Sequence, residues 1–344
     1  MAESYPRRNQ ARGIWKLSDI TSNIIDYGTF PNAGTKGIFA GGQTPSDSDV
    51  IDYITISSTG DAVDFGDLST VKKRGASGSS FTRTLFGGGY APSISNIVEY
   101  INPSSLGDAA DFGDLAAATG AFGGFSNQIR FVTAAGSAPS YTDRMDYFTI
   151  ASTGNATDFG NTSTAQTDGY CGSNPTRGVS SGGHASPADG RSNHIDYFTI
   201  MSAGNATDFG NLAAAIQGMA WASSNTRGVA CGGSTSPSSG NEVNTTQTIT
   251  YATTGDTINF GDLTAATEFL VGASDGKRGI VSGGRRHPAS QVNVIEYLTI
   301  ASAGDTADFG DLTAARTFCY NGSNGPGHGG LEAFDSRPFP CCNI

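Results

Sequence analysis

Repeated acidic and amide residues are the first candidates for chemistry in this sequence. Three Asp or Asn positions recur around each Phe-Gly pair, as in Asp61, Asp64 and Asp67 of the first copy. Calcium takes about six to eight oxygen ligands, so these residues could hold a cation. Asp and Asn also favour turns, because their side chains bond to nearby backbone groups. Since Asp and Asn exchange freely between copies, we favour turns and no cofactor, and keep calcium as the alternative.

A basic residue and an acid also recur once in most copies. The bases precede the second strand expected in each copy, and the acids lie in the third. The bases are Lys36, Arg83, Arg130, Arg177, Arg227 and Arg278, and the acids are Asp52, Glu99, Asp146, Asp196 and Glu296, with Thr250 breaking the series. This pattern suggests a structural ring of ion pairs. Exposed pairs contribute only about 0–1 kcal/mol each, so they would set register more than stability.

The remaining reactive side chains do not form a catalytic pattern. His184, His287 and His328 lie beside glycine pairs, but the matching positions in other copies are mostly Gln, Tyr, Ser or Arg. No Gly-x-Ser-x-Gly nucleophile elbow and no phosphate-binding loop occur. The five cysteines have no zinc-binding spacing and are interpreted as small core residues. We therefore expect no enzymatic activity and no metal site.

Charge and composition exclude several classes of protein. The net charge is −11, and no basic footprint of the kind that nucleic-acid binders use is present. No run of about 18 apolar residues predicts a membrane span. Glycine accounts for 48 of 344 residues, which favours short strands joined by many turns. The first residues have no apolar signal-peptide core, so secretion by that route is not expected.

Internal repetition decides the expected fold. Segments such as VIDYITISSTGDAVDFGDL and VIEYLTIASAGDTADFGDL recur six times. Their phenylalanines are Phe65, Phe112, Phe159, Phe209, Phe260 and Phe309, so successive copies are 47, 47, 50, 51 and 49 residues apart. A period near 50 is typical of kelch-type propeller blades. The order of apolar strand, glycine pair, tyrosine strand and aromatic strand also resembles the kelch motif, with Phe-Gly in place of its usual tryptophan.

Each copy predicts four short strands. Residues 170–173, 177–183 and 195–200 illustrate the first three, and the segment around Phe209 carries the fourth. Apolar residues on both faces of the third strand indicate a sheet packed between two neighbours. The aromatic residues expected to build these contacts are Trp15, Phe65, Phe112, Phe159, Phe209, Phe260, Phe309, Tyr53, Tyr100, Tyr147, Tyr197, Tyr251 and Tyr297.

The ends of the repeat region decide the blade count. Residues 317–331 provide a further first and second strand, and residues 13–20 read as an orphan fourth strand containing Trp15. Joining them predicts a seventh blade closed by an N-terminal strand, with six blades as the alternative. The expected organisation is an arm (1–12), one propeller (13–331) and a tail (332–344). Repeats are expected near 22–70, 71–117, 118–164, 165–214, 215–265 and 266–314, with the last blade from 315–331 plus 13–21.

The repeated units resemble the kelch-like repeats of virion proteins from tailed bacteriophages, particularly marine and cyanobacterial phages. The motif DYxTIxSxGxAxDFGDL carries this resemblance across residues 22–331, and residues 12–20 are similar to the start of many phage tail-fibre proteins. The resemblance implies a non-enzymatic structural or receptor-contacting protein, assembled in the host cytoplasm and located in the particle, on its surface or tail. Its partners would be other virion proteins and a host cell-surface glycan or protein, and it would be oligomeric in the particle.

Connections between the second and third strands vary most among the copies. They span residues 44–50, 90–96, 137–144, 184–193, 234–248 and 285–293. Variable loops on a rigid scaffold commonly carry recognition. The candidate recognition residues are Pro45, Tyr90, Tyr141, His184, Arg191, Arg285, Arg286 and His287. The basic N-terminal arm is the candidate docking segment. A propeller enzyme acting on carbohydrate and a cytoplasmic interaction scaffold are the alternatives.

Overall fold

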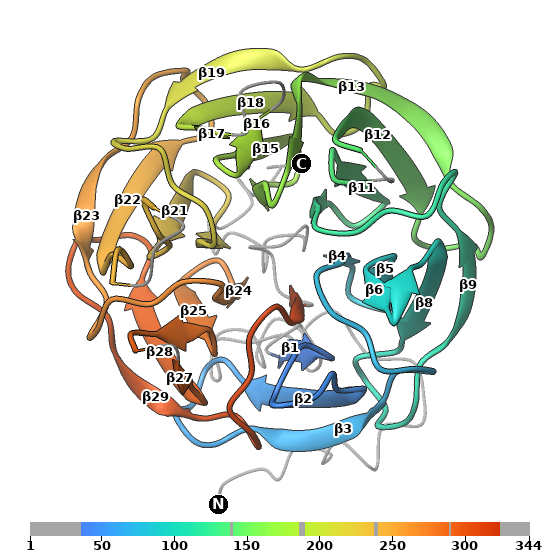
Figure 1. The fold of residues 1–344 in the computed structure, drawn as a ribbon, viewed down its shortest axis with the longest axis horizontal. Helices are drawn as coiled ribbons and strands as arrows, with labels where there is room; N and C mark the ends of the chain where they lie inside the picture. Colours follow the sequence, from blue (N-terminus) through green and yellow to red (C-terminus); the bar gives the residue numbers. More distant parts are fainter. Residues whose placement is uncertain (1–35, 138–139, 186–189, 237–239, 289, 324–344) are drawn as a thin grey trace, which may run out of the picture. The chain divides into compact units, whose positions relative to one another are not determined.

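The computed structural model describes residues 36–137, 140–185, 190–236, 240–288 and 290–323. Antiparallel strands in these residues form six sheets around one axis, like the blades of a propeller (Figure 1). The innermost strands of neighbouring blades contact one another, and the outermost strands lie at the rim. The all-β propeller and the four strands of each repeat are confirmed for the described part of the chain.

Every blade has four main strands, in order from the axis outward. The first blade contains β30 (Tyr320–Ser323), β1 (Lys36–Ala40), β2 (Val50–Thr55) and β3 (Val63–Asp67). The second contains β4 (Ala76–Ser79), β5 (Thr84–Gly87), β8 (Ile97–Ile101) and β9 (Ala110–Asp114). The third contains β10 (Gly123–Ser126), β11 (Arg130–Ala134), β12 (Thr142–Thr149) and β13 (Thr157–Thr167).

The other three blades follow the same order. The fourth contains β14 (Tyr170–Ser173), β15 (Arg177–Ser181), β18 (His194–Thr199) and β19 (Thr207–Asn211). The fifth contains β20 (Ala220–Ser223), β21 (Arg227–Cys231), β22 (Thr245–Thr250) and β23 (Ile258–Asp262). The sixth contains β24 (Val271–Ser274), β25 (Arg278–Ser282), β28 (Val294–Thr299) and β29 (Ala307–Asp311).

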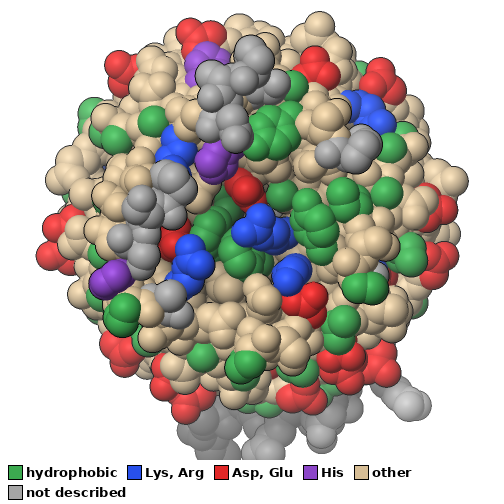
Figure 2. Space-filling view, viewed as in Figure 1, with side chains coloured by type: hydrophobic (Ala, Val, Ile, Leu, Met, Phe, Trp, Pro, Cys, Tyr) green, Lys and Arg blue, Asp and Glu red, His purple; other side chains and the backbone are tan. Residues whose placement is uncertain are grey.

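Two kinds of connection lie on one face of the propeller. A B–C connection joins the second and third strands of a blade, and a connector joins the outer strand of one blade to the inner strand of the next. Three B–C connections contain short hairpins, formed by β6 (Tyr90–Ala91) with β7 (Ser93–Ile94), β16 (His184–Ala185) with β17 (Gly190–Arg191), and β26 (Arg285–Arg286) with β27 (Ser290–Gln291). Figure 2 views the face that carries them.

The blade count is six, so the preferred expectation of seven is corrected to the alternative. Strand β30, expected to begin a seventh blade, pairs with β1 and completes the first. It contacts both β24 and β4, so the ring of inner strands closes without room for another blade. The expected closing strand at residues 13–21, with Trp15, lies outside the described residues. Pairing with β30 covers the inner edge of β1.

Tyrosines of the third strand pack against the phenylalanines of the Phe-Gly pairs within blades. Tyr53 and Phe65 meet edge to face with ring centroids 5.9 Å apart. The same arrangement joins Tyr100 to Phe112, Tyr147 to Phe159, Tyr197 to Phe209 and Tyr297 to Phe309. The phenylalanines are buried, including Phe260 of the fifth blade. These pairs place one aromatic contact in the core of each of five blades.

The fifth blade is the exception, and its register corrects the expected alignment. Thr248 lies opposite Val229, as Tyr197 lies opposite Val179 in the fourth blade. Tyr251 lies three residues further on, where its buried hydroxyl hydrogen-bonds Ser223 at 2.7 Å. Gln247 therefore occupies the place of the strand acid, which the sequence assigned to Thr250. Because Tyr251 does not hold the position of the other tyrosines, aligning the copies by their tyrosines misplaced the fifth copy. That copy is full length.

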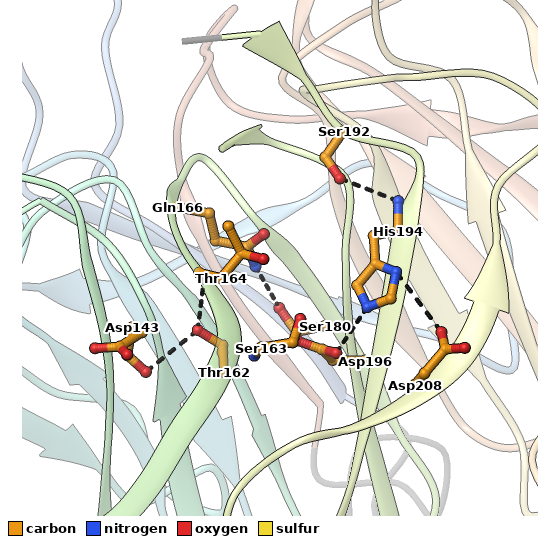
Figure 3. Close-up of polar contacts among 10 residues, drawn as sticks. All are labelled: Asp143, Thr162, Ser163, Thr164, Gln166, Ser180, Ser192, His194, Asp196 and Asp208. Carbon is orange, nitrogen blue, oxygen red and sulfur yellow. Dashed lines mark hydrogen bonds and ion pairs between the residues drawn. The ribbon is translucent and has the colours of Figure 1, made fainter. Parts of the chain in front are cut away.

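Strand acids join each blade to the preceding connector. In Figure 3, both the backbone N–H and the hydroxyl of Ser163 donate to the Asp196 carboxylate at 2.9 Å. The equivalent backbone bonds run from Ser69 to Glu99, Ala213 to Gln247, Thr264 to Glu296 and Thr313 to Asp52, at 2.9–3.2 Å. Because Gln247 keeps the acceptor oxygen, the fifth blade retains this contact without a charge.

The expected ring of ion pairs between the repeated bases and acids is wrong. Arg83 instead lies over the Tyr100 ring, 4.6 Å from its centroid, and donates to the Ile150 carbonyl of the next blade at 3.0 Å. Arg130 and Arg278 repeat both contacts. The base and acid of a repeat contact different partners, because alternate residues of a strand face opposite sides of its sheet. These bases therefore pack on a tyrosine ring of their own blade and join it to the next blade through a backbone carbonyl.

Candidate functional site

The six blades provide an internal alignment of the connectors. The residue two positions before the start of each inner strand adopts a left-handed backbone conformation, with φ between 51° and 73°. These residues are Arg74, Ala121, Asp168, Gly218, Phe269 and Phe318, and we call them the mouth ring. The Asp and Asn positions that join the outer strands of neighbouring blades are nearly constant, whereas the mouth ring contains a cation, an anion, two phenylalanines, an alanine and a glycine.

Backbone hydrogen bonds link the mouth ring from blade to blade. The N–H of Arg74 donates to the Phe318 carbonyl at 3.0 Å, and the N–H of Ala121 donates to Arg74 at 2.7 Å. Asp168 bonds to Ala121 at 2.7 Å, and Phe269 bonds to Gly218 at 2.6 Å. A left-handed conformation is unfavourable for residues with a Cβ, and glycine avoids that cost. The backbone is therefore fixed, and five of six positions keep a side chain despite the strain.

Side chains of the mouth ring form an asymmetric cluster. The guanidinium of Arg74 lies over the Phe318 ring, 3.9 Å from its centroid, and 3.7 Å from the Asp168 carboxylate. The Phe318 and Phe269 rings pack with centroids 4.3 Å apart. Figure 2 shows Lys and Arg side chains gathered with hydrophobic ones around a hollow at the centre of this face. One cation, one anion and two aromatic rings thus meet at the axis.

A second layer of charge surrounds this cluster. Arg285 pairs with the buried carboxylate of Glu268 and lies 5.3 Å from the Phe269 ring centroid. His184 contacts Gln217 through its ring nitrogen. Each of these residues flanks the axis at a connector or at the start of a B–C connection. The asymmetry therefore extends one residue outward from the mouth ring.

A small cavity lies beneath the mouth ring. Its volume is about 50 Å³, and its walls include Arg74, Asp168, Tyr170, Phe269 and Phe318. A second cavity of about 70 Å³ lies among the inner strands, next to Tyr170 and Trp221. A water occupies about 30 Å³ in the liquid, so the upper cavity has room for a small polar group rather than for a whole drug-sized ligand.

Burial changes the acid–base properties of the cavity wall. Desolvation raises the pKa of Asp168, and the positive charges of Arg74 and His184 offset part of that effect. Desolvation also holds the pKa of Tyr170 well above its usual range, with the Asp168 charge adding to the shift. The pKa of Arg191 is lowered by desolvation, which the Glu268 charge opposes. These couplings place His184 within electrostatic reach of Asp168, and Arg191 within reach of Glu268.

The eight candidate recognition residues divide into three groups. Arg285 and His184 border the mouth ring, Arg191 pairs with His184 across a hairpin, and the half-buried Tyr90 ring packs against Gly120 of the adjoining connector. Arg286 turns away from the axis and binds the Glu296 carboxylate at 3.0 Å. Pro45 and His287 are exposed, and Tyr141 is half-buried in the third B–C connection, where it forms a backbone bridge with Ser137.

Sequence reasoning missed Arg74, Asp168, Glu268, Phe269 and Phe318. The signal that would have found them was the short segment preceding each inner strand, compared across all six copies. There the residue types vary from copy to copy, whereas the Phe-Gly and Asp or Asn positions of the outer strands recur. Glycine was sought as the mark of a positive φ, and only Gly218 carries that mark in the mouth ring.

The repeated Asp and Asn residues bond between blades. The backbone N–H of Asp67 donates to Oδ1 of Asp108 in the next blade at 3.1 Å. Equivalent bonds of 2.9–3.1 Å join Asp114 to Asn155, Asn161 to Asn205, Asn211 to Asp256, Asp262 to Asp305 and Asp311 to Asp61. Oδ1 accepts equally well in Asp and Asn, which explains their exchange. No three metal-ligating side chains converge among the residues that the structure describes.

Comparisons with other proteins leave the family open. No protein-family model and no curated protein matches this chain. Within the described ranges, no helix is long and apolar enough to cross a bilayer.

Proposed function

We propose that this propeller is a non-enzymatic recognition module of a tailed-bacteriophage particle, associated with its tail, and that the mouth ring is its contact surface. The observation that carries the proposal is where the copies differ. The Asp and Asn positions that join the outer strands are repeated, while the mouth ring has five residue types at its six positions and the B–C connections differ from blade to blade. A binding protein needs such asymmetry at one surface, supported by a rigid scaffold.

The topology supports separate faces for attachment and recognition. Gly37 pairs with Ser323, so the described chain begins and ends at the same edge of the first blade. Strand β30 starts at Tyr320, two residues after Phe318 of the mouth ring, and runs away from it. Both ends of the described chain thus lie at the face opposite the mouth ring. Attachment through that face would leave the mouth ring directed outward.

Two measurements test this proposal. Mass spectrometry of purified particles should detect the full chain, and deletion of residues 1–12 should abolish its incorporation while circular dichroism shows an intact propeller. The purified full chain should bind host cells, and Phe318→Ala should reduce that binding. Lys277→Gln is the matched control, because Lys277 is exposed between β24 and β25 on the opposite face. Absence from particles, or equal loss of binding in both variants, would contradict the proposal.

The alternative of a carbohydrate-acting enzyme makes a different prediction. Asp168 lines the cavity with a raised pKa, a property that catalytic acids share. If the protein were a hydrolase, it would release reducing sugar from surface polysaccharide, and Asp168→Asn would stop the release. We expect binding without release.

A further inference from the structure

Arg74 of the mouth ring and Arg191 of the β16–β17 hairpin keep hydrogen-bond donors that the described part of the chain does not use. The Arg74 guanidinium packs its face on Phe318 and lies 3.7 Å from Asp168, but it makes no hydrogen bond to a described residue. Nε and one terminal nitrogen of Arg191 are buried and likewise have no partner there. Burying a donor without a partner is unfavourable, and more so for a charged group. A bound acceptor would remove that cost.

The charge balance favours an anion over a cation. Each nearby acid already faces an arginine of its own, because Asp168 lies beside Arg74 and Glu268 is paired with Arg285. Arg191 feels the charge of Glu268 but forms no ion pair with a described residue. The guanidinium groups of Arg74, Arg191 and Arg285 therefore outnumber the carboxylates of Asp168 and Glu268 among these residues. A guanidinium presents a planar fork of donors that matches carboxylate and phosphate oxygens.

We propose that the mouth ring binds the oxyanion of a small organic molecule, such as an acidic or phosphorylated sugar, through Arg74 and Arg191. This rests on the proposed recognition function and specifies the ligand class of the same site. The cavity of about 50 Å³ accommodates the charged group, and the half-buried Phe318 ring packs against the apolar part of the ligand. The fixed backbone of the mouth ring holds the donors in place before the ligand arrives.

Isothermal titration of the full chain with three probes tests the inference. Glucuronate supplies a carboxylate, glucose 6-phosphate supplies a phosphate, and glucose is the neutral control. We expect one or both anions to bind at least tenfold more tightly than glucose, and their order to identify the preferred oxyanion. Arg74→Gln and Arg191→Gln should each weaken that binding at least tenfold. Lys277→Gln removes the same charge from the opposite face and should leave it unchanged.

Equal affinity for glucose, no binding of either anion, or the same loss in Lys277→Gln would overturn the inference. Thermal melting of each variant checks that the fold is retained, and Arg74→Gly is a second variant that also relieves backbone strain. The two proposals fail separately. Cell binding that depends on Phe318 without anion binding would overturn only the oxyanion site, whereas anion binding with cell attachment insensitive to Phe318→Ala would overturn only the recognition function.

Discussion

Arg316 and Asp52 form a buried ion pair between the last blade and the first. Their side chains are 1% and 0% exposed. The Arg316 guanidinium also donates to the Val50 carbonyl at 2.8 Å, and the Asp52 carboxylate accepts from Thr313. Lys72 and Glu99 form the equivalent buried pair at the next junction. Charges thus join blades on both sides of the first blade, where the chain ends meet.

Removing one partner of this pair should destabilise the propeller strongly. Arg316→Met leaves the Asp52 carboxylate buried without its cation, which costs about 3–5 kcal/mol. The free energy of unfolding from denaturant titration measures the loss. Lys73→Met is the matched control, because the Lys73–Asp47 pair is partly exposed and contributes about 0–1 kcal/mol. Equal losses of unfolding free energy in the two variants would show that the Arg316–Asp52 pair is no stronger than the Lys73–Asp47 pair.

Relief of strain in the mouth ring should stabilise the fold. Ala121 has φ 54°, and a left-handed conformation costs an L-residue about 1–2 kcal/mol. Glycine loses about 0.5–1 kcal/mol in backbone entropy, so Ala121→Gly should raise the free energy of unfolding by about 0.5–1 kcal/mol. Ala118, in the same connector, has no positive φ, and Ala118→Gly should lower stability instead. If Ala121→Gly and Ala118→Gly both lowered the free energy of unfolding, backbone strain at Ala121 would be contradicted.

The contacts between outer strands should tolerate Asn but not Ala. Asp108→Asn keeps the oxygen that accepts from Asp67, whereas Asp108→Ala removes it and should cost about 1 kcal/mol. Desolvation raises the pKa of Asp67, and the Asp49 and Asp108 charges raise it further. Asp108→Asn should therefore lower the pKa of Asp67, as measured by NMR titration. An unchanged pKa, or equal stability of the Asn and Ala variants, would contradict this contact.

Buried thiols should resist alkylation until the protein unfolds. Burial raises the pKa of Cys171 to about 12 and that of Cys319 to about 11, and it also raises the pKa of Cys231. Because only the thiolate reacts, labelling at pH 8 should be about a hundredfold slower or more than in urea. Its rate should rise about tenfold per pH unit while the fold persists.

Site-resolved mass spectrometry measures this labelling in a variant with Cys341 and Cys342 replaced by serine. Rapid native labelling of Cys231 or Cys319 would mean that the inner strands are open to reagent.

Much of the scaffold could be predicted because it repeats. Alternation in residues 195–200 indicated a strand with two buried faces, and β18 has that pattern. The glycine pairs adopt positive φ as their type suggests, for example 60° and 89° at Gly88 and Gly89. A repeat gives six readings of one pattern, so the fold could be predicted although the degenerate fifth copy was misaligned.

Closure and the mouth ring could not be predicted from local pattern. Residues 320–323 read as an inner strand whether they begin a seventh blade or complete the first, and only pairing with β1 decides. Likewise, nothing in the residue types of Arg74 or Phe318 indicates a left-handed backbone. That conformation is imposed by inter-blade hydrogen bonds, such as the one from Arg74 to the Phe318 carbonyl.

The most direct test separates the scaffold from the mouth ring in one variant. Arg74→Gly combined with Asp168→Gly removes both charges of the ring and relieves two left-handed strains. The account predicts a melting temperature equal to or above that of the parent chain, together with loss of binding on an array of bacterial surface polysaccharides. Unchanged binding by the double variant would contradict it.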